Sequence, residues 1–355
     1  MRVKELSLYH FKNYLQRDFQ FDGEIICIVG KNGSGKTSIL DAIYFLCFTK
    51  SYFVNSDSLC VTKNHKGMML KAIFEKDSEH EVKCIIRENG KKELLFDTVP
   101  YTQLSKHIGL FSAVMITPDD TQLITESSDV RRKYLDVLIS QLDSNYMKHL
   151  IAYNKILQQR NALLKTAHLI DYGLLDYYDE QLSFFSILIY ETRKKIISII
   201  SKKTMGIYQF LSSEQQEEVQ IEYSSPLHKN TLENLLKENR EKDIITQRSN
   251  VGIHKDDLVF SLYNMPLKNV ASQGQRKSFL FGLKFAQFEI LKESALFSPA
   301  LLLDDIFEKL DDFRGDKIVE YISKQNGQVF ITDTHKDRLE KALNKVNKTP
   351  FYIEL

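Results

Sequence analysis

One segment of the sequence has the residue types and the spacing needed to hold a phosphate chain. Residues 30–37 read Gly-Lys-Asn-Gly-Ser-Gly-Lys-Thr, which fits the pattern G-x-x-x-x-G-K-[ST]. Glycines allow backbone N–H groups to turn inward around a β-phosphate, Lys36 can neutralise β- and γ-phosphate oxygens in binding and catalysis, and the Thr37 hydroxyl can bind Mg²⁺. The candidate nucleotide-binding residues are Gly30, Lys31, Asn32, Gly33, Ser34, Gly35, Lys36 and Thr37.

The sequence around this loop predicts the elements that would hold it in place. Residues 25–29, Ile-Ile-Cys-Ile-Val, form a short apolar run rich in β-branched side chains, which indicates a buried strand. Residues 38–48 have the apolar spacing of a helix. Strand, glycine loop and helix in this order are the context that a phosphate-binding loop requires. We call residues 30–37 the P-loop.

Two adjacent acids near the other end of the chain could supply the metal and water chemistry of a nucleotide site. Residues 300–303, Ala-Leu-Leu-Leu, predict a buried strand that ends in Asp304 and Asp305, the form of a Walker B element. Many buried strands end in Asp, but this one shares a chain with a P-loop. We therefore expect Asp304 to hold Mg²⁺, either as a direct ligand or through one of the metal's own ligands, and Asp305 to be the catalytic carboxylate that polarises the attacking water.

A third segment, Ser272-Gln273-Gly274-Gln275, precedes an apolar helix predicted at 279–291. In isolation this segment is typical of a serine-capped helix. Its place in the chain, after a P-loop and a long insert and before the Walker B acids, instead favours contact with a γ-phosphate through Ser272, Gly274 and Gln275. We call residues 272–275 the signature segment.

The remaining pattern predicts an α/β body interrupted by a helical insert. Residues 72–96 alternate in short stretches around Asn89-Gly90, which indicates antiparallel strands with a tight turn, and residues 113–116 predict another buried strand. Apolar side chains repeat at helical spacing over 135–164 and again over 182–199, which predicts an antiparallel helical hairpin. Residues 214–250 are expected to form a helical return segment with loops.

These patterns predict three segments. Residues 1–128 would form the N-terminal half of an ATPase head, residues 129–250 a helical arm inserted into it, and residues 251–355 the C-terminal half, which carries the signature segment and the Walker B acids. The expected fold class is α/β, a P-loop ATPase body with a helical-hairpin insert lobe.

Net charge and cysteine usage restrict the possible partners. The whole chain carries a net charge of +1, so any polyanion must be bound by a local patch. Residues 129–211 hold 12 Lys and Arg against 8 Asp and Glu, with clusters at 131–133, 193–195 and 202–203. The four cysteines form no Cys-x-x-Cys pair and predict buried, reduced thiols. With no signal-peptide pattern and no long apolar run, we expect a cytoplasmic protein without a membrane partner.

The chain closely resembles the RecF family of bacterial recombination and gap-repair ATPases, within the ATP-binding-cassette superfamily of chromosome and repair ATPases. The resemblance covers nearly the whole chain. Besides the P-loop it is carried by these segments: FKNY at 11–14, DAIY at 41–44, PDD at 118–120, VRRKYLD at 130–136, GIHKDDL at 252–258, SQGQRK at 272–277 and LLLDD at 301–305.

The resemblance implies that ATP is held between two copies, with the P-loop of one copy facing Ser272, Gly274 and Gln275 of the other. Slow Mg²⁺-dependent hydrolysis would release the dimer, as a switch. The implied role is in the repair of DNA damage, during replication and in the SOS response: the protein would bind gapped or junction DNA, single- and double-stranded, without reading its sequence. It would aid recombinase loading with RecR-like and RecO-like mediators as partners.

The resemblance also implies that the fold is an ABC-type P-loop ATPase head with a helical-hairpin insert lobe, and it implies roles for three further residues. His335, after the apolar strand expected at 329–331, would be a switch histidine that touches the γ-phosphate. Lys12 would lie near the nucleotide. His254 belongs to a family hallmark, and a structural or inter-lobe hydrogen bond is as compatible with it as contact with nucleotide or DNA.

Three departures from the family pattern stand out. Residues 308–311 read Glu-Lys-Leu-Asp where many relatives carry Ser-Glu-Leu-Asp. Thr117-Pro118-Asp119 stands where the wider superfamily places a Mg²⁺-linked glutamine. Lys255 replaces an arginine, which exchanges a bidentate group for a point charge.

Two other functions share the nucleotide motifs. An SMC-like chromosome-structuring ATPase would need helical arms of hundreds of residues, whereas this insert is short. An ABC transporter subunit would carry a glutamine loop and a compact helical subdomain before its signature, and it would lack the FKNY opening. Both alternatives are therefore less favoured than a DNA-repair ATPase.

Overall fold

The computed structural model describes residues 1–166, 170–212, 217–295, 297–307 and 311–355. By their internal contacts they fall into two units, each described here by itself. The first unit comprises Met1–Asp120, Ile207–Gln215 and Leu280–Leu355, and the second comprises Thr121–Gly206 and Gln216–Phe279. These bounds differ from the three predicted segments, because 251–279 belong to the same unit as most of the insert.

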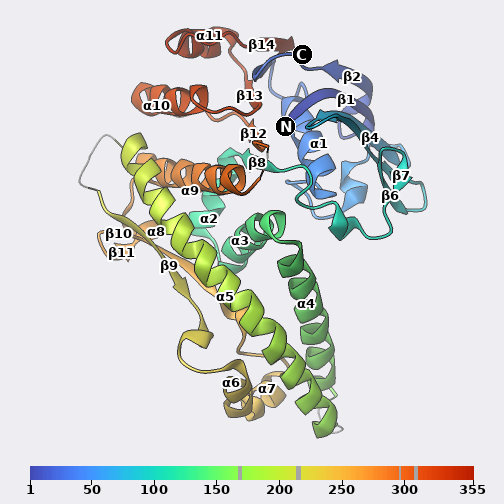
Figure 1. Cartoon of the computed structure of the whole chain (residues 1–355), viewed down its shortest axis with the longest axis vertical. Helices are drawn as coiled ribbons and strands as arrows, with labels where there is room; N and C mark the ends of the chain where they lie inside the picture. The colour runs from blue at the N-terminus through green and yellow to red at the C-terminus, as the bar shows by residue number, and fades with distance from the viewer. Residues whose placement is uncertain (167–169, 213–216, 296, 308–310) are drawn as a thin grey trace. The chain divides into compact units, whose positions relative to one another are not determined.

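A five-stranded parallel sheet forms one layer of the first unit (Figure 1). Its strands lie in the order β14-β3-β13-β12-β8, and all four pairings are parallel. In such a sheet the carboxyl ends of the strands meet at one edge, where ligands bind. The bounds are β3 Ile25–Val29, β8 Ala113–Ile116, β12 Ala300–Leu303, β13 Val329–Asp333 and β14 Phe351–Glu354.

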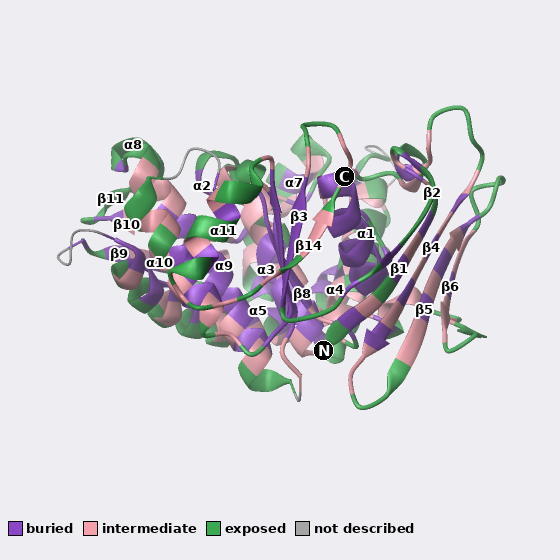
Figure 2. Cartoon of the chain, turned by 90° about the horizontal axis from the view of Figure 1, so that it is seen from above, coloured by how far each residue is buried: buried purple, intermediate pink, exposed green. Residues whose placement is uncertain are grey.

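Helix α1, Lys36–Phe48, follows the P-loop and is apolar on every side, with nearly all of its residues buried. A helix that is hydrophobic all round must be covered on all sides. Helix α1 meets this requirement because it contacts β8 and β13 on one side and β1, β4 and β5 on another, and Figure 2 shows it among the buried parts of the chain.

The second layer of the first unit is a six-stranded antiparallel sheet, in the order β2-β1-β4-β5-β6-β7. The predicted turn at Asn89-Gly90 is confirmed, because it joins β5 to β6 and Gly90 takes a φ of +79°. The strands are β1 Arg2–Phe11, β2 Tyr14–Gln20, β4 Met68–Glu75, β5 Glu79–Ile86, β6 Lys92–Phe96 and β7 Val99–Pro100. Helices α10 Asp312–Ser323 and α11 Lys336–Asn344 also belong to this unit.

The second unit contains the predicted helical hairpin, but its first arm is not one continuous helix. Helix α3, Ser128–Leu142, ends at Asp143, and helix α4, Ser144–Leu164, begins there. Asp143 is extended, and its carboxylate accepts a hydrogen bond from the backbone N–H of Asn145. An aspartate in this position starts a new helix. The second arm, α5, runs from Tyr172 to Leu211 beside α4 (Figure 1).

Residues 232–238 and 240–246 of the expected return segment at 214–250 are helical, but the segment also contains a strand that the sequence did not predict. Residues 219–224 form strand β9, whose buried Val219 and Ile221 alternate with polar residues, and β9 pairs with β10 in a three-stranded sheet ordered β11-β10-β9. The other elements with residues in the second unit are α2 Gln122–Thr125, α6 Leu232–Glu238, α7 Arg240–Thr246, β10 Asp257–Leu262, β11 Met265–Pro266, α8 Leu267–Val270 and α9 Gln273–Ser294, which continues into the first unit.

No helix in the described ranges is both long and apolar enough to cross a membrane.

Candidate functional site

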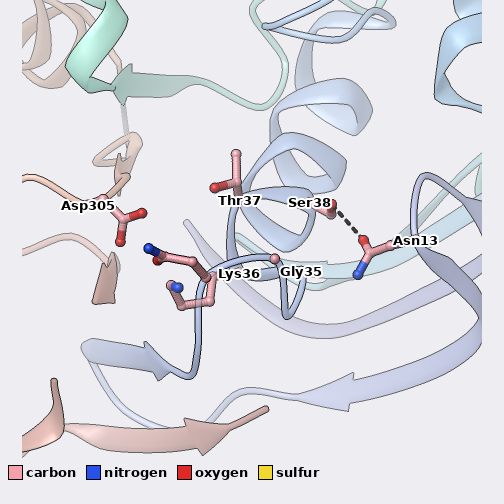
Figure 3. Close-up of a pocket in the computed structure, with 8 residues that line it drawn as sticks. Asn13, Gly35, Lys36, Thr37, Ser38 and Asp305 are labelled. Carbon is pink, nitrogen blue, oxygen red and sulfur yellow. Dashed lines mark hydrogen bonds between the residues drawn. The ribbon is translucent and has the colours of Figure 1, made fainter. Parts of the chain in front are cut away.

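The P-loop lines a cavity of about 170 Å³ in the first unit (Figure 3). Gly33 and Gly35 have φ angles of +81° and +106°, in the region that favours glycine. A Cβ on Gly35 would also lie 2.5 Å from Nδ2 of Asn13, so a side chain there would displace Asn13. The lining residues are Asn13, Asn32, Gly33, Gly35, Lys36, Thr37, Ser38 and Asp305.

The ammonium group of Lys36 is buried without a carboxylate partner among the described residues. Its Nζ donates to the backbone carbonyls of Gly30 at 2.9 Å and Lys31 at 3.2 Å, and its residue is only 4% exposed. Among the residues that the structure describes, no carboxylate forms an ion pair with it. A buried ammonium held only by carbonyls is costly, and a phosphate oxygen would supply the missing charge. The cavity therefore fits a phosphate group.

Asp304 lies directly after β12 and connects the Walker B element to the P-loop. Its carboxylate accepts a hydrogen bond from the Thr37 hydroxyl, at 2.9 and 3.0 Å to its two oxygens, and another from Thr332 at 2.9 Å. Burial raises the pKa of this carboxyl to about 6, and the hydrogen bonds from Thr332 and Thr37 only partly oppose the rise. A hydroxyl and a carboxylate at this spacing fit a divalent cation, which would favour the ionised form.

Asp305 turns its carboxylate toward the same cavity. Its backbone has a φ of +44°, an unfavourable conformation for a non-glycine residue, and its N–H donates to Thr332 Oγ1 at 2.8 Å. Figure 3 shows the Asp305 side chain on the Lys36 side of the cavity. The strained turn after β12 thus separates the two acids, so that Asp304 faces Thr37 while Asp305 lines the cavity.

Sequence reasoning missed two residues at this site. Asn13 lines the cavity and accepts from the Ser38 hydroxyl at 2.9 Å, which ties the β1–β2 turn to the start of α1. Thr332, in β13, contacts both Walker B acids. A usable signal existed for Thr332, because parallel neighbours β12 and β13 must end at the same edge of the sheet.

The structure does not bring Lys12 and His335 into the described cavity lining. Lys12 Nζ pairs at 2.6 Å with Asp41, which is fully buried. His335 is exposed at the start of α11, and its backbone N–H donates to Asp333 at 2.8 Å. The nucleotide contacts expected of these two side chains therefore stay predictions.

The signature segment, in the second unit, forms a reciprocal cap at the start of α9. The Ser272 hydroxyl oxygen accepts from the backbone N–H of Gln275 at 3.2 Å, and the Gln275 side-chain oxygen accepts from the backbone N–H of Ser272 at 2.7 Å. This is the capping-box arrangement. Ser272 is exposed, and this cap uses its hydroxyl only as an acceptor, so its proton can be donated to a ligand oxygen.

His254 has a structural role inside the second unit. Its Nε2 lies 3.1 Å from the carbonyl of Ser249, and its Nδ1 lies 2.8 Å from the hydroxyl of Tyr153. A carbonyl accepts only, so Nε2 carries the proton and Nδ1 accepts from Tyr153. Burial lowers the pKa of His254 to about 4, which keeps the ring neutral.

The basic clusters of the insert divide into structural and exposed residues. Arg193 is 2% exposed, with its guanidinium 2.7 Å from Asp256 and 2.8 Å from Asp136, so it does not belong to an exposed basic patch. By contrast, Lys194 and Lys195 are exposed on α5, and neither forms an ion pair with any described residue.

The segments where the sequence departs from the family pattern have structural roles where they are described. After β8, Asp120 accepts from the backbone N–H of Thr117 at 2.7 Å and pairs with buried Lys284 at 2.9 Å. Residues 308–310 lie outside the described residues, and Asp311 caps α10 by accepting from the N–H of Arg314 at 2.9 Å.

The predicted buried thiols are confirmed, because the four cysteines are free and buried. Within the described ranges, no group of three or more His, Cys, Asp or Glu side chains could hold a metal ion by itself.

Comparison with known proteins agrees with this architecture. The model of the RecF/RecN/SMC N-terminal domain family matches residues 2–352. The DNA replication and repair protein RecF of Flavobacterium johnsoniae is 42% identical over 98% of this chain and 98% of its own length. The protein of the same name from Cytophaga hutchinsonii is 40% identical over 95% of this chain and 90% of its own length.

Comparison with solved structures agrees with these sequence matches. The recombination mediator protein RecF with ATP, from the RecFOR pathway, superposes with a TM-score of 0.88 at 28% identity, over 94% of this chain and 92% of that chain. An Smc head bound to the C-terminal winged-helix domain of ScpA has a TM-score of 0.56 at 15% identity, over 94% of this chain and 90% of that chain, a likeness of fold alone. The expected fold class, an ABC-type ATPase head, is confirmed. With a P-loop, Walker B acids and a family match over nearly its whole length, this chain belongs to the RecF family of DNA replication and repair proteins.

Proposed function

We propose that this protein is an ATP-dependent DNA-binding repair protein that dimerises on ATP, binds gapped or junction DNA, and aids recombinase loading and replication-fork repair. Slow, Mg²⁺-dependent ATP hydrolysis resets it. The names of its relatives support this role, because the curated ones are DNA replication and repair proteins and the solved one is a recombination mediator with ATP. RecR-like and RecO-like mediators are its partners.

The buried Lys36 ammonium is the observation that carries the proposal. It lies in a cavity with carbonyl partners only, beside the Thr37–Asp304 pair. In the proposed site Lys36 binds the β- and γ-phosphate oxygens, and Thr37 and Asp304 hold Mg²⁺. The metal, when bound, neutralises charge on the phosphates. Asp305 orients and polarises the attacking water from the cavity wall.

The signature segment supports ATP-dependent pairing of two copies. Ser272 presents a hydroxyl proton at the positive end of α9, where the helix dipole favours an anion. We assign Ser272, Gly274 and Gln275 to the γ-phosphate held by the P-loop of a second copy. Each site would then be complete only in a dimer.

Residues 129–250 are the proposed DNA-binding arm. The exposed ammonium groups of Lys194 and Lys195 are available for backbone phosphates, whereas Arg131 and Arg193 already pair with Asp257 and Asp256. Phosphate contacts position DNA without reading bases, so binding tolerates different sequences.

Analytical ultracentrifugation with Mg²⁺-ATP tests the proposal, with and without a gapped duplex. We expect a monomer without nucleotide, a dimer with Mg²⁺-ATP, and a dimer strengthened by DNA. Lys36→Ala should stay monomeric because it cannot bind ATP, and Ser272→Arg should bind ATP without dimerising. A wild-type monomer under every condition, or a normal dimer of Ser272→Arg, would refute the shared site.

A further inference from the structure

Gln275, in the signature segment, has a second side-chain partner besides its capping bond. Its Nε2 donates to Oε1 of Glu217 at 2.5 Å, across 58 positions in the sequence. Glu217 is 4% exposed and lies two residues before β9 begins at Val219. Both residues belong to the second unit. We infer that Glu217 is a positioning residue, which acts through Gln275 to hold the signature segment in the geometry that receives a γ-phosphate.

The two ends of the Gln275 amide perform different tasks. Its oxygen accepts from the backbone N–H of Ser272, and its nitrogen donates to Glu217. A carboxylate accepts only, so Glu217 requires the amide nitrogen on its side. The amide oxygen is thereby directed at Ser272, which completes the cap. Without Glu217 the amide could rotate, and the cap would lose the bond that closes it.

The cap determines how Ser272 presents its hydroxyl. Because Ser272 Oγ accepts from the N–H of Gln275, the hydroxyl oxygen is fixed against the first turn of α9 and its proton is directed away from that N–H. Ser272 is exposed, so solvent would otherwise compete for this hydroxyl. A preorganised donor binds a phosphate oxygen without the entropy cost of ordering it.

Glu217 is itself anchored. The ladder of β9 with β10 begins two residues after it, where Val219 pairs with Leu262, and it continues to Ser224 opposite Asp257. A buried carboxylate is unfavourable unless polar partners satisfy it. The Glu217 carboxylate meets the Gln275 amide at the start of α9, so polar satisfaction of this buried group and the orientation of Gln275 depend on the same bond.

This inference rests on the proposed ATP-dependent dimer. Two readouts distinguish a failure of the proposed dimer from a failure of the role assigned to Glu217. The first readout is the ATP-driven dimerisation constant, from sedimentation, beside the ATP affinity of the monomer. The second is hydrogen–deuterium exchange of the full-length protein without nucleotide, in the peptide that covers residues 272–276. The variants are Glu217→Ala, Glu217→Gln, Gln275→Ala and the Glu217→Ala/Gln275→Ala double variant. Glu218→Ala is the matched control, because Glu218 is the exposed neighbour.

For Glu217→Ala we expect unchanged ATP affinity of the monomer, a dimer weakened about ten-fold, which corresponds to about 1.4 kcal/mol, and about ten-fold faster exchange at 272–276. Glu217→Gln should restore both, since its amide oxygen can accept from Gln275. Glu218→Ala should behave as wild type. In the Gln275→Ala background, Glu217→Ala should have no further effect.

The inference would be overturned if Glu217→Ala changed dimer affinity and exchange equally in the wild-type and Gln275→Ala backgrounds. Unchanged exchange at 272–276 in Glu217→Ala would also overturn it. If Glu217→Ala does not fold, Gln275→Glu breaks the same bond from the other partner, because it keeps an oxygen for the N–H of Ser272 and cannot donate to Glu217, and it must give the same exchange result. If the wild-type protein stays monomeric with ATP, the proposed pairing fails, and the exchange measurement still decides whether Glu217 holds the signature segment. If the wild type dimerises and Glu217→Ala dimerises equally well, only this inference fails.

Discussion

Acidification should destabilise this protein through His254. The buried environment of the His254 ring determines how much free energy of unfolding is lost. Burial lowers the pKa of His254 from its ordinary value of 6.5 to about 4. Its Nε2–H donates to the Ser249 carbonyl and its Nδ1 accepts from Tyr153, so both nitrogens are occupied in the neutral form. A proton added at Nδ1 would displace the bond from Tyr153 and leave a charge in a partly buried site.

The sign follows from comparing the folded and unfolded chains. Between pH 6.5 and about 4 the unfolded chain takes up a proton at this position and the folded chain does not. The unfolded state binds more protons there, so stability falls as the pH falls through this window and is fully retained above it. The loss reaches about 2 kcal/mol at pH 5 and about 3 kcal/mol near pH 4.

Two measurements test this reasoning. The ring resonances of the nine histidines can be followed by NMR against pH, with His254 assigned by its absence from the spectrum of His254→Asn. Urea unfolding followed by circular dichroism at pH 8 and pH 5 compares the two proteins, and wild type should lose about 2 kcal/mol more than the variant. A His254 resonance that titrates near pH 6.5, or an equal loss in both proteins, would refute the assignment.

Two further substitutions test the nucleotide site and the arm. Asp304→Asn should raise the thermal stability of the nucleotide-free protein, because burial raises the pKa of Asp304 to about 6 and a neutral amide removes that buried charge. The same variant should lose the extra stability that Mg²⁺-ATP gives the wild type. Calorimetry compares the two proteins with and without Mg²⁺-ATP. A lower melting temperature of Asp304→Asn without nucleotide would contradict the expected gain in stability. The double variant Lys194→Glu/Lys195→Glu should weaken DNA binding and flatten its salt dependence with ATP affinity unchanged. Equal DNA affinity of the wild type and the double variant by fluorescence anisotropy would remove these lysines from the interface.

Much of the local structure could be predicted because its causes are local. The apolar run at 25–29 becomes the fully buried β3, and the glycine spacing of 30–37 becomes a loop with positive φ at Gly33 and Gly35. The break at Asp143 was missed although a helix-capping signal is present in the sequence, because the helical period of the apolar side chains continues across it. Strand β9 was missed for a similar reason, since its six alternating residues lie among polar ones.

Roles that depend on a distant partner could not be predicted from the pattern. Arg193 belongs to a run of three basic residues that is typical of a solvated face, but the fold places Asp256 and Asp136 against it and buries it. Lys12 and Asp41 pair across 29 positions, an ion pair that the residues around either of them do not indicate. In each case the side chain's environment comes from elements far away in the chain.

The sequence by itself determined that this protein has a P-loop between a strand and a helix, acids at the end of a second buried strand, and a capped helix at the signature segment. Glycine conformation, apolar period and helix capping act over a few residues, so a linear pattern records them. Only the tertiary structure decided that Thr332 joins the two Walker B acids, that Asn13 closes over the P-loop, and that Glu217 orients Gln275. These contacts depend on strand order and register, which arise when segments tens to hundreds of residues apart pack together.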